Sequence, residues 1–241
     1  WGPRARDVLR EVTDGAVDDA ALPVRQARTI RIRRGVGGGG ADARASAAEV
    51  LATRLSYAGE LGWELTVRPS DAEAVWDAIA GAGRTHGLEP IGYRALESLR
   101  LEKGFRYFGA ELTPRETPFE AGMDRFVRLD KPGGFVGRDA LVARRQTDPD
   151  GPTRRLRTLV MGGGDWIPVY GGEAVRLDGA VIGRLRSAAF GYTIGRTIGT
   201  AYLPVSLPEG AAVEVDVFAD RLTAEVAPDV LVDPTGTRMR G

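Results

Sequence analysis

The stretch Thr147-Asp148-Pro149-Asp150-Gly151-Pro152 divides the sequence into two parts of different character. Aspartate, proline and glycine gathered in this way are typical of turns and linkers. Beyond them the chain has short strand patterns with turns between, among them Leu177–Ala180, which is typical of a two-residue hairpin turn. Over 213–217 three valines alternate with acidic residues. These patterns predict a small antiparallel β-barrel or sandwich over 153–241.

Before the linker, helix patterns and strand patterns follow one another. The segment after Gly2 has apolar residues at helical intervals, and Val24–Arg34 alternates isoleucine with arginine, which is typical of a strand with one exposed face. A capping box over Ser70–Glu73 predicts a helix that ends before Gly87 and buries Val75, Trp76 and Ile79. The fold class is therefore α+β.

The whole chain is expected to form an α+β domain over 1–146 and an all-β domain over 153–241. It has 241 residues, with 33 Lys+Arg against 33 Asp+Glu and a formal net charge of zero. Zero net charge argues against a nucleic-acid partner, because phosphate neutralisation needs an excess of Lys and Arg. With no cysteine and the single histidine His86, we expect no disulfide, no thiolate nucleophile and no metal site. No membrane-spanning stretch or signal peptide is found, so we expect a cytoplasmic protein without a membrane partner.

The run Gly35–Gly40 matches G-x-G-x-x-G, the spacing that cradles a dinucleotide phosphate. In a run so rich in glycine, however, the spacing arises without selection for it. The strand before it carries Arg31 and Arg33, whereas a dinucleotide-binding first strand is near-continuously apolar. The pattern favours a flexible loop over a phosphate site.

A second candidate site lies in the hairpin predicted over Leu55–Val67. If residues 59–62 form its loop, Tyr57 and Glu64 face one another across the two strands, with Cβ atoms about 5 Å apart. A carboxylate beside an aromatic plane suits a flat aminopyrimidine, whose two parallel N–H groups the carboxylate accepts. The alternative is an exposed glutamate at a sheet edge and a tyrosine packed in the core.

The remaining polar residues that stand out have plainer interpretations. Glu97, Arg100 and Glu102 lie on one expected helix, where the spacing is typical of a solvated ion-pair face. His86 is expected at the surface near a helix C-terminus, where the helix dipole favours its cation.

Beyond these patterns, the sequence resembles the glycine-cleavage T-protein (aminomethyltransferase) family over nearly its whole length. The hairpin resembles the family signature Y-T/A-G-E-x-G-[FWY]-E, and the barrel part resembles its C-terminal domain. The strings that carry the resemblance are Ser56–Leu65 (SYAGELGWEL), Glu97–Gly104 (ESLRLEKG), Thr117–Gly122 (TPFEAG), Gly134–Leu141 (GFVGRDAL), Gly2–Leu9 (GPRARDVL) and the segment from Asp178 to Pro204.

The resemblance implies tetrahydrofolate binding and one-carbon transfer. By position, Tyr57 matches the family's folate-contacting tyrosine and Glu64 its pterin-recognising glutamate. The resemblance also implies the C-terminal part of a T-protein-like folate-binding domain, truncated at its N-terminus and followed by a small antiparallel β-barrel. The family's catalytic aspartate lies upstream of the string that begins in this sequence at Gly2. We therefore expect no catalytic residue among these 241 residues and an inactive isolated chain.

One departure from the family concerns the folate-binding arginine, since Leu96 stands in its place and Arg94 and Arg100 are the candidates to replace it. Leu96 and the string Glu102–Arg106 make the chain more similar to the folate domains of FAD-dependent dimethylglycine and sarcosine dehydrogenases. In these, a flavin oxidises an N-methyl group and folate captures the carbon as 5,10-methylenetetrahydrofolate. The partners would be folate, a methylated amine and a flavin domain of the same parent chain, and any FAD would belong to that domain. The alternatives are an aminomethyltransferase, a folate-dependent demethylase or a non-catalytic folate-binding module.

Overall fold

The computed structural model describes residues 1–33 and 47–241 of the chain. The glycine run Gly35–Gly40 lies outside the described residues. No helix in the described part of the chain combines the length and the apolar character needed to cross a membrane.

The described residues form two compact units. The first contains residues 1–96 and 233–241, and the second contains residues 97–232. The linker at 147–152 falls inside the second unit. The division into domains over 1–146 and 153–241 stays a prediction.

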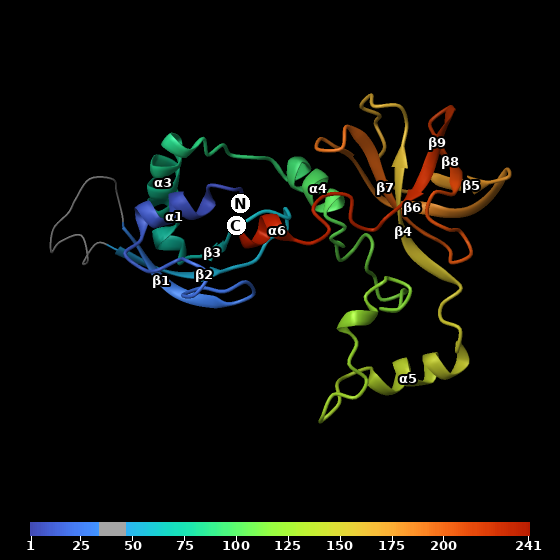
Figure 1. Cartoon of the computed structure of the whole chain (residues 1–241), viewed down its shortest axis with the longest axis horizontal. Helices are drawn as coiled ribbons and strands as arrows, with labels where there is room; N and C mark the ends of the chain where they lie inside the picture. The colour runs from blue at the N-terminus through green and yellow to red at the C-terminus, as the bar shows by residue number, and fades with distance from the viewer. Residues whose placement is uncertain (34–46) are drawn as a thin grey trace. The chain divides into compact units, whose positions relative to one another are not determined.

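A three-stranded antiparallel sheet, in the order β1-β2-β3, forms the centre of the first unit. Helices α1 and α3 lie on one face of it (Figure 1). The elements are α1 (Ala5–Val12), β1 (Ala27–Arg33), β2 (Ala47–Thr53), β3 (Glu64–Thr66) and α3 (Ala72–Gly83).

Buried and exposed residues alternate along β1 and β2, and the buried ones form the core of the first unit. Ile30 and Ile32 of β1 are buried while the arginines between and beside them are not, and β2 buries alternate residues in the same way. The buried side chains meet those of α1 and α3 in one cluster. Because side chains alternate along a strand, the opposite face of the sheet is exposed, and it carries Arg31 and Glu49 beside the apolar Leu51.

Helix α3 differs in two details from the sequence-based expectation. A turn of 3₁₀ helix over Pro69–Asp71 precedes it in place of the predicted capping box, and Trp76 is 60% exposed rather than buried. Val75 is buried as predicted, with Ala78 on the same face. The predicted stop is confirmed, because Gly87 ends the helical segment in the left-handed conformation with φ 70°.

The predicted β-rich part is a closed six-stranded antiparallel barrel in the order β4-β7-β6-β5-β8-β9 (Figure 1). Asp178 and Gly179, with φ of 50° and 81°, form the predicted hairpin turn, and the three valines over 213–217 are buried. The α+β fold class with a small antiparallel barrel is thus confirmed. The strands are β4 (Arg154–Met161), β5 (Ala174–Leu177), β6 (Ala180–Gly191), β7 (Arg196–Pro204), β8 (Ala212–Val217) and β9 (Asp220–Ala227).

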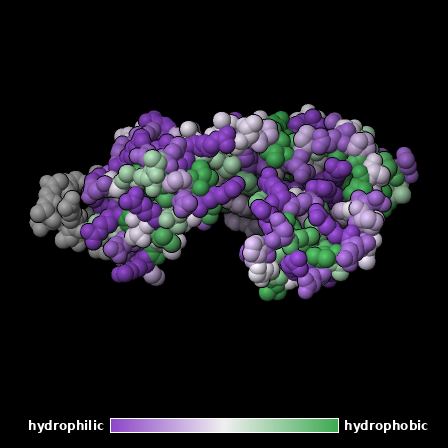
Figure 2. Space-filling model, turned by 60° about the horizontal axis from the view of Figure 1, so that its bottom comes forward, coloured by the Kyte–Doolittle hydropathy of each residue, from purple (hydrophilic) through white to green (hydrophobic). Residues whose placement is uncertain are grey.

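The described residues also form the helices α4 (Tyr93–Glu102), α5 (Arg138–Thr147) and α6 (Thr237–Arg240). Helix α5 follows Gly137 as predicted and buries none of its residues. Hydrophilic side chains cover most of the molecular face in Figure 2, with hydrophobic ones scattered among them in small groups.

Helix α4 does not carry the solvated ion-pair face that its sequence suggested. Arg100 is completely buried, and Glu102 is 2% exposed. The Arg100 guanidinium donates to Glu97 at 2.7 Å, to Glu111 at 2.6 Å and to the Ser187 hydroxyl of β6 at 2.9 Å. The predicted i,i+3 pair of Glu97 and Arg100 is present. Arg100 also bonds to Glu111 and to Ser187 of β6, and helical spacing could not predict these two partners.

The Glu111 carboxylate continues this network onto β7. The carboxylate accepts a hydrogen bond from the Thr200 hydroxyl at 3.0 Å. The backbone carbonyl of Glu111 accepts one from the Tyr202 hydroxyl at 2.8 Å. Burial, together with the nearby charge of Glu116, raises the pKa of Tyr202 to about 12. Buried charges are tolerated only when fully paired, so this network fixes α4 and the segment after it against the barrel.

Arg100→Met should lower the free energy of unfolding by about 3–5 kcal/mol, because it leaves the buried carboxylate of Glu111 without its counter-charge. Urea denaturation followed by circular dichroism measures this change. Arg221→Met is the matched control, since Arg221 pairs with Glu214 and Asp216 at the surface and its loss should cost less than about 1 kcal/mol. Equal losses in the two variants would contradict the role given to Arg100.

Candidate functional site

The segment that carries Tyr57 and Glu64 is a wide loop rather than a tight hairpin. Strand β2 ends at Thr53, and β3 begins at Glu64, which pairs directly with Thr53. The predicted cross-strand pairing of Tyr57 with Glu64 is therefore wrong. Tyr57 lies within residues 54–63, which we call the connecting loop, and Glu64 is the first residue after it.

The backbone of Arg54 explains why the chain does not turn back early. Its N–H donates to the carbonyl of Gln26, and its carbonyl accepts the N–H of Arg25, each at 2.9 Å. Arg54 therefore continues the pairing toward β1. A compact turn follows, in which the Ser56 hydroxyl accepts the N–H of Glu60 at 2.9 Å. Spacing around the glycines could not predict this continuation.

The first two residues of the chain hold the connecting loop on one side. The Trp1 indole N–H donates to the carbonyl of Leu55, and the N–H of Gly2 donates to that of Leu61, both at 2.8 Å. The indole lies so close to Gly62 that a Cβ there would be 2.1 Å from the Trp1 ring. Gly62 is thus required by close approach rather than by a turn.

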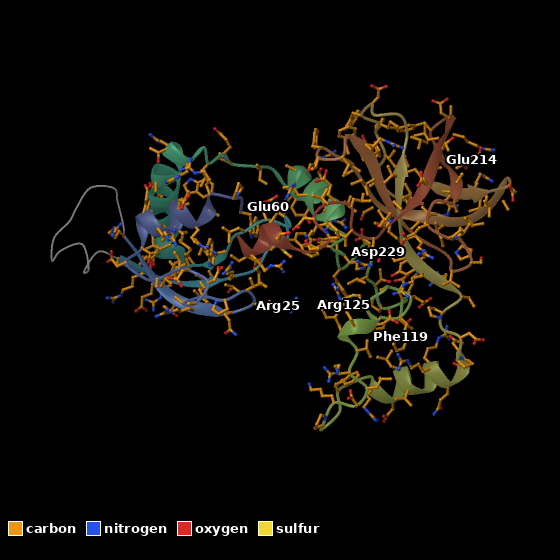
Figure 3. All side chains as sticks on the ribbon, in the orientation of Figure 1. Arg25, Glu60, Phe119, Arg125, Glu214 and Asp229 are labelled. Carbon is orange, nitrogen blue, oxygen red and sulfur yellow. The ribbon has the colours of Figure 1, made fainter. Side chains whose placement is uncertain are left out.

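Residues from the C-terminal segment hold the loop on another side. Arg238 of α6 pairs with Glu60 at 3.1 Å, and the carbonyl of Arg240 accepts a hydrogen bond from the Arg54 guanidinium at 2.8 Å. Figure 3 labels Glu60 beside α6. No local pattern predicts these contacts, because the partners are far apart along the chain.

Glu64 and Tyr57 have different surroundings. Glu64 is exposed and projects from the sheet face opposite the core, since its neighbour Leu65 packs into the core cluster. Among the described residues, nothing forms a hydrogen bond or ion pair with the Glu64 carboxylate, so all its lone pairs are open to a ligand. Tyr57 is half-buried in the connecting loop.

The two arginines proposed to replace the family's folate-binding arginine are placed differently. Arg100 is wrong as a candidate, because its guanidinium is buried and committed to Glu97, Glu111 and Ser187. Arg94 is exposed at the start of α4, and Leu96 is half-buried. Which cation, if any, takes the place of that arginine stays a prediction.

Three further features were candidates for a functional site: His86, groups that could hold a metal ion, and a surface groove. His86 lies at the end of the helical segment, as expected, where its side chain is 11% exposed and bonds through Nε2 to the Glu11 carboxylate. In the part of the chain that the structure describes, no group of three His, Cys, Asp or Glu residues could hold a metal ion. A groove of about 350 Å³ in the second unit is lined by Phe119, Asp124 and Arg145, with residues 148–152 at its edge.

Two family models match the chain, and together they cover most of its length. The model of the GCVT N-terminal domain matches residues 1–131, and that of the glycine cleavage T-protein C-terminal barrel domain matches residues 154–233. The chain belongs to the glycine-cleavage T-protein family. The resemblance stated from the sequence strings is confirmed.

Individual members of the T-protein family are similar over almost the whole chain. Human mitochondrial dimethylglycine dehydrogenase is 36% identical over 242 residues, which cover 99% of this chain and 26% of that protein. An aminomethyltransferase of Saccharopolyspora erythraea is 35% identical, over 93% of this chain and 56% of that protein. The chain thus spans about a quarter of the first relative and about half of the second.

The fold of the T-protein family is also found in a solved structure. The aminomethyltransferase T of the glycine cleavage system from Bartonella henselae superposes with a TM-score of 0.68 over 99% of this chain and 83% of that one. Sequence identity is 22%, so this comparison supports the fold alone.

Gly62→Ala should displace the Trp1 indole from the connecting loop, because the new methyl group would overlap it. We expect a loss of about 1–3 kcal/mol in the free energy of unfolding and a red-shifted tryptophan emission. Gly92→Ala is the matched control, since nothing lies within 4 Å of a Cβ at Gly92. Identical stability and emission in the two variants would show that Trp1 does not hold the loop.

Proposed function

We propose that this chain is the tetrahydrofolate-binding part of an enzyme that captures a one-carbon unit. The carbon would come from oxidation of an N-methylated glycine derivative, as in the dimethylglycine and sarcosine dehydrogenases, and would leave as 5,10-methylenetetrahydrofolate. Bound folate would supply the nucleophilic nitrogen, N5. The residues of this chain would hold and orient the pterin and keep water away from it.

The open carboxylate of Glu64 carries the proposal. A flat aminopyrimidine edge presents two parallel N–H donors, and a carboxylate without a competing partner accepts both. Glu64 is held at a fixed place by its ladder pairing with Thr53. An exposed acid on a rigid strand can bind a ligand without first breaking an ion pair.

Tyr57 is proposed as the second folate contact, from the connecting loop. Its phenol ring would cover part of the pterin, and the turn closed by Ser56 and Glu60 limits its freedom. Tyr57 lies in the connecting loop and Glu64 is the first residue of β3, so the two are not the cross-strand pair that spacing suggested. A folate held by both residues would therefore contact a loop and a strand end.

Similarity to the dimethylglycine dehydrogenases supports the oxidative source of the carbon. The chain covers 26% of the human enzyme, so a flavin domain and FAD, if used, are proposed for another part of a parent protein. The expected cytoplasmic location stays a prediction, and the human relative is described as mitochondrial.

The second candidate function is that of an aminomethyltransferase, which the similarity to the Saccharopolyspora protein favours. Both functions use folate, so the folate site is common to them. A flavin-binding sequence far upstream in the parent gene would support the oxidative function.

Glu64→Gln should weaken binding of 5-formyltetrahydrofolate by about 10- to 150-fold, because the amide replaces one acceptor oxygen with a donor. Isothermal titration calorimetry on the whole 241-residue chain measures this change. The test concerns binding, because the resemblance assigns no catalytic residue to this chain.

The matched control is Glu49→Gln, since Glu49 is also an exposed glutamate on the same face of the sheet. It should leave the affinity unchanged. Equal affinity of Glu64→Gln and the unaltered chain would place the ligand elsewhere. Failure of the unaltered chain to bind would contradict the proposal for these residues.

A further inference from the structure

We propose that Arg54 is a positioning residue of the folate site, which fixes the connecting loop so that Tyr57 and Glu64 are presented together. This inference rests on the proposed function. In the proposed role Arg54 acts on the connecting loop, which contains Tyr57 and leads to Glu64.

The Arg54 side chain is 2% exposed, and Arg54 directly follows the last residue of β2, the central strand of the sheet. One guanidinium nitrogen donates to the Asp19 carboxylate and, at 3.1 Å, to the carbonyl of Leu22. The other donates to the carbonyl of Arg240 at 2.8 Å. The hydrogen bond from Arg54 lowers the pKa of the Asp19 carboxyl, which keeps the pair ionised.

The same guanidinium also reaches the far end of the connecting loop. Its central carbon lies 5.9 Å from the ring centroid of Trp63, within the range of a cation–π contact. Trp63 directly precedes Glu64, and Arg54 lies three positions before Tyr57. One side chain thus connects the start of the loop with its end.

This arrangement needs arginine. Its planar fork donates in several fixed directions at once, whereas a lysine ammonium is a compact charge that cannot span the same partners. The loop has no regular ladder of its own, so the order of its backbone depends on such side-chain contacts and on Trp1. A loop ordered before the ligand arrives binds it more tightly, because less conformational entropy is lost on binding.

The test compares Arg54→Met with Arg33→Met. Arg33 makes the same kinds of contact, with the Asp14 carboxylate and the carbonyl of Glu11, but at the far end of β1. Both proteins are measured below their unfolding temperatures, by hydrogen exchange of the amides over 55–62 and by calorimetric titration of 5-formyltetrahydrofolate. If Arg54→Met does not fold, Arg54→Lys replaces it.

We expect Arg54→Met to raise the exchange rates of the amides over 55–62 and to weaken folate binding by at least about tenfold. Arg33→Met should change neither quantity, and the exchange of the barrel amides should be the same in both variants. A merely stabilising role would lower the unfolding temperature without changing the affinity of the folded protein. Unchanged loop exchange, or unchanged affinity where the unaltered chain binds, would overturn the inference. If the unaltered chain binds no folate, the proposed function fails, and loop exchange alone decides whether Arg54 holds the loop.

Discussion

The buried guanidinium of Arg54 is a constraint on which the order of the connecting loop in the first unit depends. It joins the end of β2 to Asp19, to Leu22 and to Arg240 of α6, segments that nothing else in the sequence marks as neighbours. A buried guanidinium is costly unless it is paired, and the two terminal nitrogens of Arg54 find their acceptors only where these segments come together. This requirement acts on the connecting loop together with the contacts that Trp1, Gly2 and Arg238 make with it.

The second unit depends on a similar constraint. Arg100 is buried between Glu97 and Glu111, and the network continues to Ser187 and Thr200 of the barrel. Each unit therefore has an apolar cluster and one buried arginine that fixes an irregular segment against it. Apolar packing stabilises a fold but is not directional. The hydrogen bonds of a guanidinium are directional, so they fix the orientation of the segments that accept them.

Local patterns in the sequence predicted the elements whose causes are local. The alternation of Ile30 and Ile32 with arginines, the Asp178-Gly179 turn and the stop at Gly87 each follow from neighbouring residues, and all three are present. The connecting loop was predicted wrongly because its course is set by Arg54, whose partners lie far away in the sequence. For the same reason Arg100 was taken for a surface residue: Glu111 and the barrel strands cannot be inferred from helical spacing. The candidate residues Tyr57 and Glu64 came from the predicted hairpin spacing and from the resemblance, and the open carboxylate of Glu64 is consistent with the role proposed for it.

The central claim is that Glu64 recognises the pterin of a folate. A crystal structure of the 241-residue chain with 5-formyltetrahydrofolate tests it most directly. The account predicts that the two carboxylate oxygens of Glu64 accept parallel hydrogen bonds from the aminopyrimidine edge, at about 2.7–3.0 Å, with Tyr57 against the ring. A pterin bound elsewhere, with the Glu64 carboxylate facing solvent, would contradict it.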